Sequence, residues 1–275
     1  MIYTRCTSTQ LQIQSKLCSP VIAKQSPTAS AGFTLLELLV VITLLAVLAS
    51  AALLGYEGIQ DQGRYDVARF EMAEIRKALL KFRRDSGANA FPTQGQYDCT
   101  DDFNGGNSTV QNSLMTFPSE AGVNDAEIIA WCQHPTNFWM LFQDPFGSGW
   151  NIDTRRGWNG PYLQRKTGYV DVSENINPNG TGSLNIGAVI ANLWGVASPF
   201  NTTPIGANAY YSWRPATSEP DYEKFGTPYF LFDLDTSVAR ITSLNADHDY
   251  NGDDDCEQNV GSDGFPLDSI LCLLK

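Results

Sequence analysis

The hydrophobic pattern divides the first third of the chain into two helical segments. Residues 38–56 form a run of 19 mostly apolar positions without one charged side chain. As a helix this run would be about 28 Å long, close to the thickness of a bilayer core. Further along, apolar side chains recur every three to five positions, at Val67, Phe70, Ile75, Ala78, Leu79 and Phe82. This spacing is typical of an amphipathic helix, so the pattern predicts one long helix over residues 33–86.

The residues at the end of the second segment predict where the helix stops. Lys81, Arg83 and Arg84 crowd its last turn, where positive charge interacts favourably with the helix dipole. Gly87 follows and is a plausible terminating residue. Three further glycines, Gly55, Gly58 and Gly63, mark the join between the two halves, where the helix can bend or fray.

After Gly87 the pattern changes to short elements separated by long polar stretches rich in asparagine and glycine. Apolar clusters predict short helices at 126–132 and 137–143. Alternating apolar positions predict short antiparallel strands at 210–213, 228–235 and 239–244. The sequence therefore predicts an α+β fold, in which a long N-terminal helix packs on a small antiparallel sheet with long loop insertions.

Charge separates the first 32 residues from the rest. The chain has a net charge of −12, which argues against nucleic acid as a partner. Residues 1–32 carry Arg5, Lys16 and Lys24 and no acidic residue, so the remainder has a net charge of −15. A basic head before an apolar run is a targeting arrangement, whose positive end stays in the cytoplasm. An ordinary secretory signal, cleaved near Ala-Ser-Ala at 49–51, is the alternative, although the small residues at 29–32 precede the apolar run.

One carboxylate, Glu37, lies directly before the charge-free run. A charge inside a membrane segment costs about 2.5–3.5 kcal/mol at the centre and less near an end. Either Glu37 has a partner that offsets this cost, or it lies at the membrane interface. We expect a partner.

The six cysteines divide into two groups. Cys6 and Cys18 lie in the basic head, whereas Cys99, Cys132, Cys256 and Cys272 lie beyond the apolar run. An even count outside the membrane suggests two disulfides with three possible connectivities, and four free buried thiols are the alternative. We predict the nearest-neighbour pairing, Cys99–Cys132 and Cys256–Cys272.

Acidic side chains concentrate near the end of the chain. Residues 233–268 hold ten acidic side chains and one basic side chain, Arg240. Within them, Asp247-x-Asp249-x-Asn251-Gly252-Asp253 fits the first seven positions of a calcium loop. The twelfth position is Gln258 rather than Glu, and no helical pattern flanks both sides, so we reject a true EF-hand. We expect one Ca²⁺ here, because only a cation can hold so many carboxylates together; a solvated acidic loop is the alternative.

Enzymatic signatures are lacking in the sequence. Its two histidines are His134, next to Pro135, and His248, within the acidic segment. No Gly-x-Ser-x-Gly, P-loop or dinucleotide-binding pattern occurs. We therefore expect a protein that is not an enzyme. A membrane-anchored enzyme or sugar-binding module is the least favoured alternative.

The stretch "GFTLLELL" at residues 32–39 resembles the processing site of type IV pilins and of the pseudopilins of type II secretion. The resemblance implies that a prepilin peptidase cleaves after Gly32 and that the new terminal residue, Phe33, is methylated. It also implies that Glu37 is retained within a filament. There, the Glu37 carboxylate of one subunit can pair with the cationic amine of Phe33 in its neighbour, which offsets the cost of burial and fixes the register.

Weaker similarity extends to the major pseudopilin, the G subunit of type II secretion. Residues 76–96 are similar to its helix end and Tyr-Pro-Thr turn, and "GWNGPYLQ" at 157–164 resembles its Trp-Arg-Gly-Pro-Tyr-Leu stretch. Residues 241–255 lie where that family has a calcium loop. The resemblance and the acidic pattern together imply a set of calcium ligands that comprises the Leu244 carbonyl, Asp247, Asp249, Asn251, Asp253, Asp254 and Asp255.

The chain departs from the usual G subunit in three respects. It is much longer, with the extra length at 95–154 and 170–227. Leu54 occupies the place of a proline that the family usually has near the twenty-second mature residue. Four cysteines beyond the membrane segment are more typical of some pilins.

The resemblance implies a division of the chain into four parts. Residues 1–32 would be a cleaved prepilin leader, 33–56 a transmembrane half-helix, 57–87 an amphipathic half-helix and 88–275 a globular periplasmic domain. The expected protein is a single-pass inner-membrane pseudopilin that forms a helical homo-oligomeric filament in the periplasm with other minor pseudopilins. A pilin of a surface type IV pilus, used in adhesion or motility, is the alternative.

Overall fold

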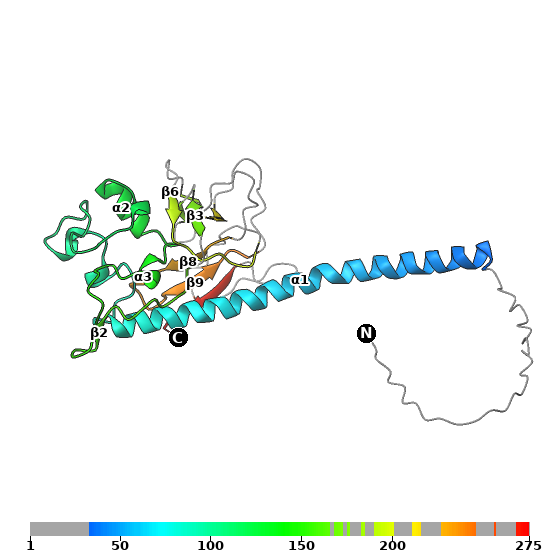
Figure 1. The fold of residues 1–275 in the computed structure, drawn as a ribbon, viewed down its shortest axis with the longest axis horizontal. Helices are drawn as coiled ribbons and strands as arrows, with labels where there is room; N and C mark the ends of the chain where they lie inside the picture. Colours follow the sequence, from blue (N-terminus) through cyan, green and yellow to red (C-terminus); the bar gives the residue numbers. More distant parts are fainter. Residues whose placement is uncertain are drawn as a thin grey trace, which may run out of the picture. The chain divides into compact units, whose positions relative to one another are not determined.

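The structure is a computed structural model that describes residues 33–165, 168–172, 175–176, 183–184, 190–200, 211–215, 227–245, 256 and 268–274. Its largest element is helix α1 (Leu35–Asp85), which is 51 residues long (Figure 1). The chain divides into two compact units, residues 1–53 and residues 54–275. The bounds of α1 confirm the single helix predicted over residues 33–86, to within two residues at its start and one at its end.

The second half of α1 buries one face in the core of its unit. The buried positions follow steps of three and four residues: Tyr65, Ala68, Met72, Ile75, Leu79 and Phe82. The predicted stripe was wrong at two positions, because Val67 is 47% exposed and Phe70 is 68% exposed. Apolar side chains occur on two faces of this helix, and the sequence periodicity alone does not show which face has partners. The structure supplies them, since Tyr65 packs against Phe200 and Phe82 packs against Tyr97.

The helix ends as the sequence predicted. The backbone N–H of Ser86 donates the last helical hydrogen bond to the Phe82 carbonyl at 2.8 Å. Gly87 then adopts a φ of +73°, a left-handed conformation that favours glycine at a helix end. The absence of a side chain at Gly87 also leaves room for the stem of Arg156, which packs directly over this position.

Short helical segments follow α1. Helix α2 (Asp125–Cys132) begins after Asn124, whose side chain accepts a hydrogen bond from the Glu127 N–H at 3.0 Å, as N-cap residues do. Helix α3 is a single turn, Trp139–Phe142. Both lie within the ranges predicted at 126–132 and 137–143, to within one residue. Three 3₁₀ turns accompany them: η1 (Gly95–Tyr97), η2 (Asp101–Phe103) and η3 (Ser119–Ala121).

The described strands form small antiparallel sheets. Two sheets have three strands, in the orders β10-β9-β8 and β6-β3-β7, and two sheets are pairs, β1-β2 and β4-β5. The bounds are β1 Trp150–Asn151, β2 Arg156–Gly157, β3 Gly168–Val172, β4 Asn175–Ile176, β5 Ser183–Leu184, β6 Ile190–Leu193, β7 Tyr211–Pro215, β8 Tyr229–Phe232, β9 Arg240–Ser243 and β10 Ser269–Cys272. The predicted strands correspond to β7, β8 and β9. The predicted α+β class, with a long N-terminal helix and small antiparallel sheets, is confirmed.

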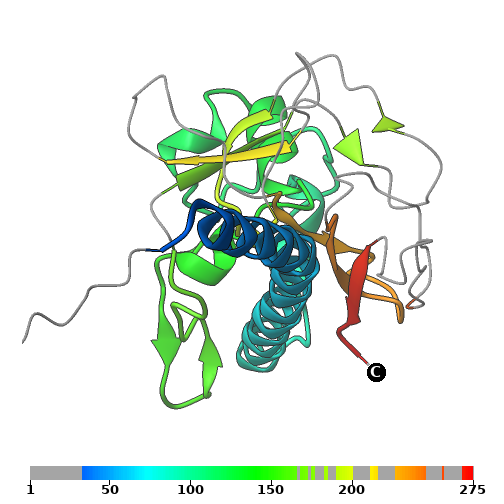
Figure 2. The same cartoon turned by 90° about the vertical axis from the view of Figure 1, so that its right-hand side faces the viewer.

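The β10-β9-β8 sheet is joined to the second half of α1 by long-range hydrogen bonds. The Tyr229 hydroxyl donates to Glu71 Oε2 at 2.7 Å, and Arg76 Nε donates to the Leu273 carbonyl at 3.2 Å. Figure 2 shows this orange-to-red sheet on one side of the helix and the green β1-β2 hairpin on the other. Burial and the neighbouring Glu71 carboxylate raise the pKa of Tyr229, so the hydroxyl remains a donor over the physiological pH range.

Replacing Tyr229 with Phe should lower the free energy of unfolding by about 1.5–3 kcal/mol, because a part-buried hydrogen bond to a charged group is lost. Chemical denaturation of the full chain in detergent measures this change. Glu71→Gln and the double variant complete a double-mutant cycle. A coupling energy near zero would contradict the assigned role of this hydrogen bond.

Candidate functional site

The first turn of α1 has a capping arrangement built from Thr34 and Glu37. Thr34 precedes the helix, and its side-chain oxygen accepts a hydrogen bond from the Glu37 N–H at 3.2 Å. Its carbonyl accepts the first helical hydrogen bond, from the Leu38 N–H at 3.1 Å. A threonine followed three residues later by glutamate has the spacing of a capping box. Thr34 was not among the predicted site residues, although its Thr-x-x-Glu spacing to Glu37 is a recognisable signal in the sequence.

The position of Glu37 in this turn is electrostatically favourable. A carboxylate near a helix N-terminus interacts with the unpaired N–H groups and the positive end of the helix dipole. Both Glu37 and Phe33 are exposed in the single chain, so both are available to another molecule. Gly32, the predicted cleavage position, lies outside the described residues.

Large apolar side chains cover all sides of the helix that follows. Between Phe33 and Leu48 they are 45% to 88% exposed. The polar hydroxyls of this segment are satisfied within the helix, since Thr43 donates to the Val40 carbonyl and Ser50 donates to the Val47 carbonyl. Among the described residues, no helix combines the length and apolar character needed to cross a membrane. The transmembrane half predicted at 33–56 therefore stays a prediction.

Comparison with known proteins finds a family match, and it covers the start of this helix. Residues 28–53 match the family described as the prokaryotic N-terminal methylation motif. The matched range contains the predicted cleavage and methylation positions, Gly32 and Phe33, together with Glu37. No curated protein and no solved structure matched the chain. The chain thus carries a type IV pilin-like signal, which implies processing by a prepilin peptidase and assembly into a filament.

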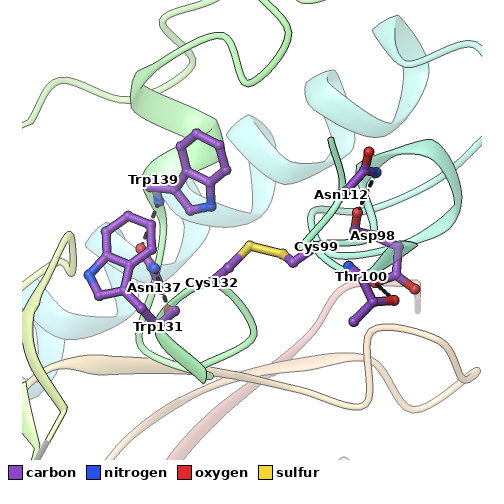
Figure 3. Close-up of a disulfide and its surroundings, with 8 residues drawn as sticks. All are labelled: Asp98, Cys99, Thr100, Asn112, Trp131, Cys132, Asn137 and Trp139. Atoms are coloured by element: carbon purple, nitrogen blue, oxygen red, sulfur yellow. Dashed lines mark hydrogen bonds between the residues drawn. A yellow bond between two sulfur atoms is a disulfide. The ribbon is translucent and has the colours of Figure 1, made fainter. Parts of the chain in front are cut away.

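The first predicted disulfide, Cys99–Cys132, is present and fully buried (Figure 3). It joins the segment after η1 to the last residue of α2. Hydrogen bonds hold both flanks in place, because Asn112 Nδ2 donates to the Asp98 carbonyl at 2.8 Å and Asn137 Nδ2 donates to the Trp131 carbonyl at 2.6 Å. The disulfide therefore fixes α2 against the loop that follows α1.

The second predicted disulfide, Cys256–Cys272, is also present, with a Cα–Cα distance of 5.8 Å. It joins Cys256 to the last residue of β10 and closes a loop with a sequence separation of 16. The nearest-neighbour pairing is thus confirmed for both disulfides, and the alternative of four free thiols was wrong. In the chain-entropy model, a loop of this length contributes about 3 kcal/mol to stability.

The predicted calcium ligands lie mostly outside the described residues. The structure does not describe Asp247, Asp249, Asn251 or Asp253–Asp255. Leu244 is described and is fully buried. Within the described ranges, no group of three or more His, Cys, Asp or Glu side chains could hold a metal ion.

Polar residues at the two described ends of this segment are completely buried. They are Thr242, Ser243, Asn245, Asp268 and Ser269. Ser243 and Ser269 are paired in the β9-β10 register, and their hydroxyls have no hydrogen-bond partner within the described structure. Buried polar atoms normally have partners, so these orphaned oxygens are compatible with a hydrated ion or further ligands nearby. Asp268 was not among the predicted ligands and lies 13 residues beyond the last of them, Asp255.

The basic residue of the acidic region has a structural partner. Arg240 is fully buried, forms an ion pair with Asp233 and lies over the Phe232 ring. Arg240 thus neutralises one of the ten acidic side chains of residues 233–268.

His134 is a buried neutral residue of the core. Its Nδ1 accepts a hydrogen bond from the Thr136 N–H at 3.2 Å, so the ring proton is on Nε2. Burial lowers the pKa of His134 to about 3. This geometry indicates a role in shaping the turn before Phe138.

Proposed function

We propose that this protein is a structural subunit of a type IV-like filament, and specifically a pseudopilin of the type II protein secretion system. The observation that carries the proposal is the match to the N-terminal methylation motif over residues 28–53, with Glu37 in the first turn of a 51-residue helix. The proposed role is structural and not enzymatic. Further support comes from the similarity of residues 76–96 and 157–164 to the major pseudopilin.

A pilin of a surface type IV pilus, acting in adhesion or motility, is the second candidate. The observation that favours it is the pair of disulfides in the soluble domain, since such cysteines are more typical of some pilins. Both candidates share the same processing and assembly chemistry. They differ in whether the filament acts in type II secretion or forms a surface pilus.

In the proposed assembly, the apolar segment first anchors the subunit in the inner membrane. The 19 uncharged residues at 38–56 suit a membrane span, and the basic residues of 1–32 favour a cytoplasmic leader. The disulfides suit an oxidising compartment, which supports a periplasmic location for the globular domain. Prepilin peptidase, copies of the same chain and other minor pseudopilins are the proposed partners.

Glu37 is the proposed assembly residue. Cleavage after Gly32 would create a cationic amine on Phe33, one helical turn from the Glu37 carboxylate. In a stack of staggered helices, the carboxylate of one subunit can reach the amine of its neighbour, and their pairing offsets the desolvation of both charges. The exposed Glu37 and the exposed apolar side chains around it support this arrangement.

Replacing Glu37 with Gln should leave membrane insertion and cleavage intact but abolish filament assembly, because the isosteric amide cannot neutralise the amine. Sedimentation and electron microscopy of sheared filaments measure assembly, and immunoblotting measures cleavage. Thr34→Ala is the matched control, since it removes only a helix cap worth about 1 kcal/mol and should permit assembly. Glu37→Gln filaments at wild-type abundance would show that the charge pair is not required.

We also propose that the acidic segment binds one Ca²⁺. Asp247, Asp249, Asn251 and Asp253–Asp255 would supply oxygen ligands with the Leu244 carbonyl, and hard cations prefer such ligands. The buried, orphaned hydroxyls of Ser243 and Ser269 at the ends of the segment support a polar centre there. The fully buried Asp268 is a further candidate ligand.

Millimolar calcium should raise the melting temperature of the full chain in detergent relative to chelator, with magnesium a poor substitute. At tenfold excess over Kd the gain is about 1.4 kcal/mol. Asp247→Ala should abolish the difference, whereas Asp153→Ala, an exposed carboxylate of another loop, should retain it. An equal melting temperature with and without calcium would contradict the proposed site.

A further inference from the structure

A pocket of about 660 Å³ opens beside the C-terminal end of α1. Three stretches of the chain contribute to it: residues 86–88 directly after the helix, residues between 96 and 114, and residues between 146 and 158, which include the β1-β2 hairpin. Figure 1 shows β2 next to the last turns of α1. All lining residues belong to the globular unit of residues 54–275. The volume lies in the range of binding sites for small ligands.

Aromatic side chains form the apolar wall of this pocket. The Tyr97 and Phe146 rings pack against each other, with centroids 5.3 Å apart. The Trp158 ring is held in place because its Nε1 donates to the Met140 carbonyl at 2.7 Å. Phe103 lines the same pocket and is 51% exposed. A large apolar side chain that is exposed at the edge of an aromatic pocket marks a binding surface, so the rings offer a flat apolar contact to a ligand.

One cation, Arg156, lies at the pocket, and the described residues give its guanidinium no ion pair and no hydrogen bond. Its stem packs over Gly87, where a Cβ would collide with it. The next residue, Gly157, has a φ of +114°, and a Cβ there would collide with the Gly149 carbonyl. These glycines hold Arg156 beside the pocket. None of the described lining residues carries a carboxylate that could balance its charge.

Neutral amides complete the lining. Asn151 Oδ1 accepts hydrogen bonds from the Asp153 and Thr154 N–H groups at 3.0 and 2.9 Å, which orients the amide and leaves Nδ2 to donate to a ligand. Gln96 is oriented as well, because its Nε2 donates to the backbone carbonyl that follows α1 at 3.3 Å. Oriented amides beside flat apolar rings suit a sugar ring, which has hydroxyls at its edge and apolar C–H groups on its faces. The unpaired Arg156 favours a ligand with a carboxylate.

We propose that this pocket binds an acidic saccharide, with a sugar ring against Phe103 and Trp158 and a sugar carboxylate paired with Arg156. The proposal rests on the proposed export of the globular domain, where saccharides of this class occur, but it does not depend on filament assembly. Two sources share the chemistry: peptidoglycan, whose lactyl ethers carry carboxylates, and polymers of uronic acids. The filament subunit would thus carry a ligand site in addition to its assembly residues.

Isothermal titration calorimetry of the full chain, in a detergent without a sugar headgroup, measures the binding. The probes form two matched pairs: N-acetylglucosaminyl-N-acetylmuramic acid with chitobiose, and digalacturonate with digalactose. At least one acidic probe should bind with a Kd of about 1 mM or lower. It should bind about fivefold more tightly than its neutral partner, which is the upper effect of an exposed ion pair. The acidic probe that binds more tightly identifies the source.

Three variants locate the binding. Arg156→Gln should remove the preference for the acidic probe, and Phe103→Ala should weaken both members of the pair about two- to tenfold, the range for one lost aromatic contact. Arg155→Gln is the matched control, because Arg155 is an exposed cation of the same hairpin that does not line the pocket. It should bind like the parent chain. All three positions are exposed, so the variants should keep the parent's melting temperature.

Three outcomes would overturn the proposal: no binding of either acidic probe, equal preference in the parent chain and Arg156→Gln, or tighter binding of the tripeptide Phe-Glu-Phe than of either saccharide. The last result would assign the pocket to a peptide. Filament assembly is not part of these measurements, so their failure is distinguishable from a failure of the proposed filament function.

Discussion

A single carboxylate at the start of an apolar helix is the constraint on which this account depends. Glu37 is held in the first turn of α1, where Thr34 caps the backbone and the helix dipole favours negative charge. These local interactions make Glu37 compatible with the helix, but they leave its carboxylate exposed beside uncovered apolar side chains. In the proposed filament, a cation from another subunit would complete the arrangement. The proposed filament follows from this requirement, because each processed chain would supply both the amine and the carboxylate.

The second half of α1 connects the N-terminal signal to the globular unit. One face packs into the core through Met72, Leu79 and Phe82, and the Tyr229–Glu71 hydrogen bond joins it to the β10-β9-β8 sheet. The disulfides stabilise the parts of this unit that have little regular structure, around α2 and at the end of β10. The opposite face of the same helix remains exposed. Helix α1 therefore packs on its own domain with one face and leaves the other face exposed.

Much of the fold could be predicted from the sequence, and the predictions that were wrong or missing failed for physical reasons. The helix limits were predictable because Gly87 and the charge-free run are strong local signals, and the cysteine pairing followed sequence proximity. The buried face of α1 was predicted wrongly at Val67 and Phe70, because two faces are apolar and only tertiary contacts distinguish them. Strands β3, β6 and β10 were missed, since each pairs with strands that are distant in sequence. The burial of Asp268 likewise depends on the β9-β10 pairing, which no local pattern reveals.

The mature amino terminus tests most directly whether residues 28–53 act as a prepilin processing signal. Mass spectrometry of the protein purified from its native membranes should find a chain that begins at Phe33 with one methyl group on its amine. Such a terminus would establish the cationic amine that Glu37 is proposed to pair with. A mature chain that begins near residue 51, at the Ala-Ser-Ala stretch, would contradict this, because it would lack Glu37 and most of the apolar segment.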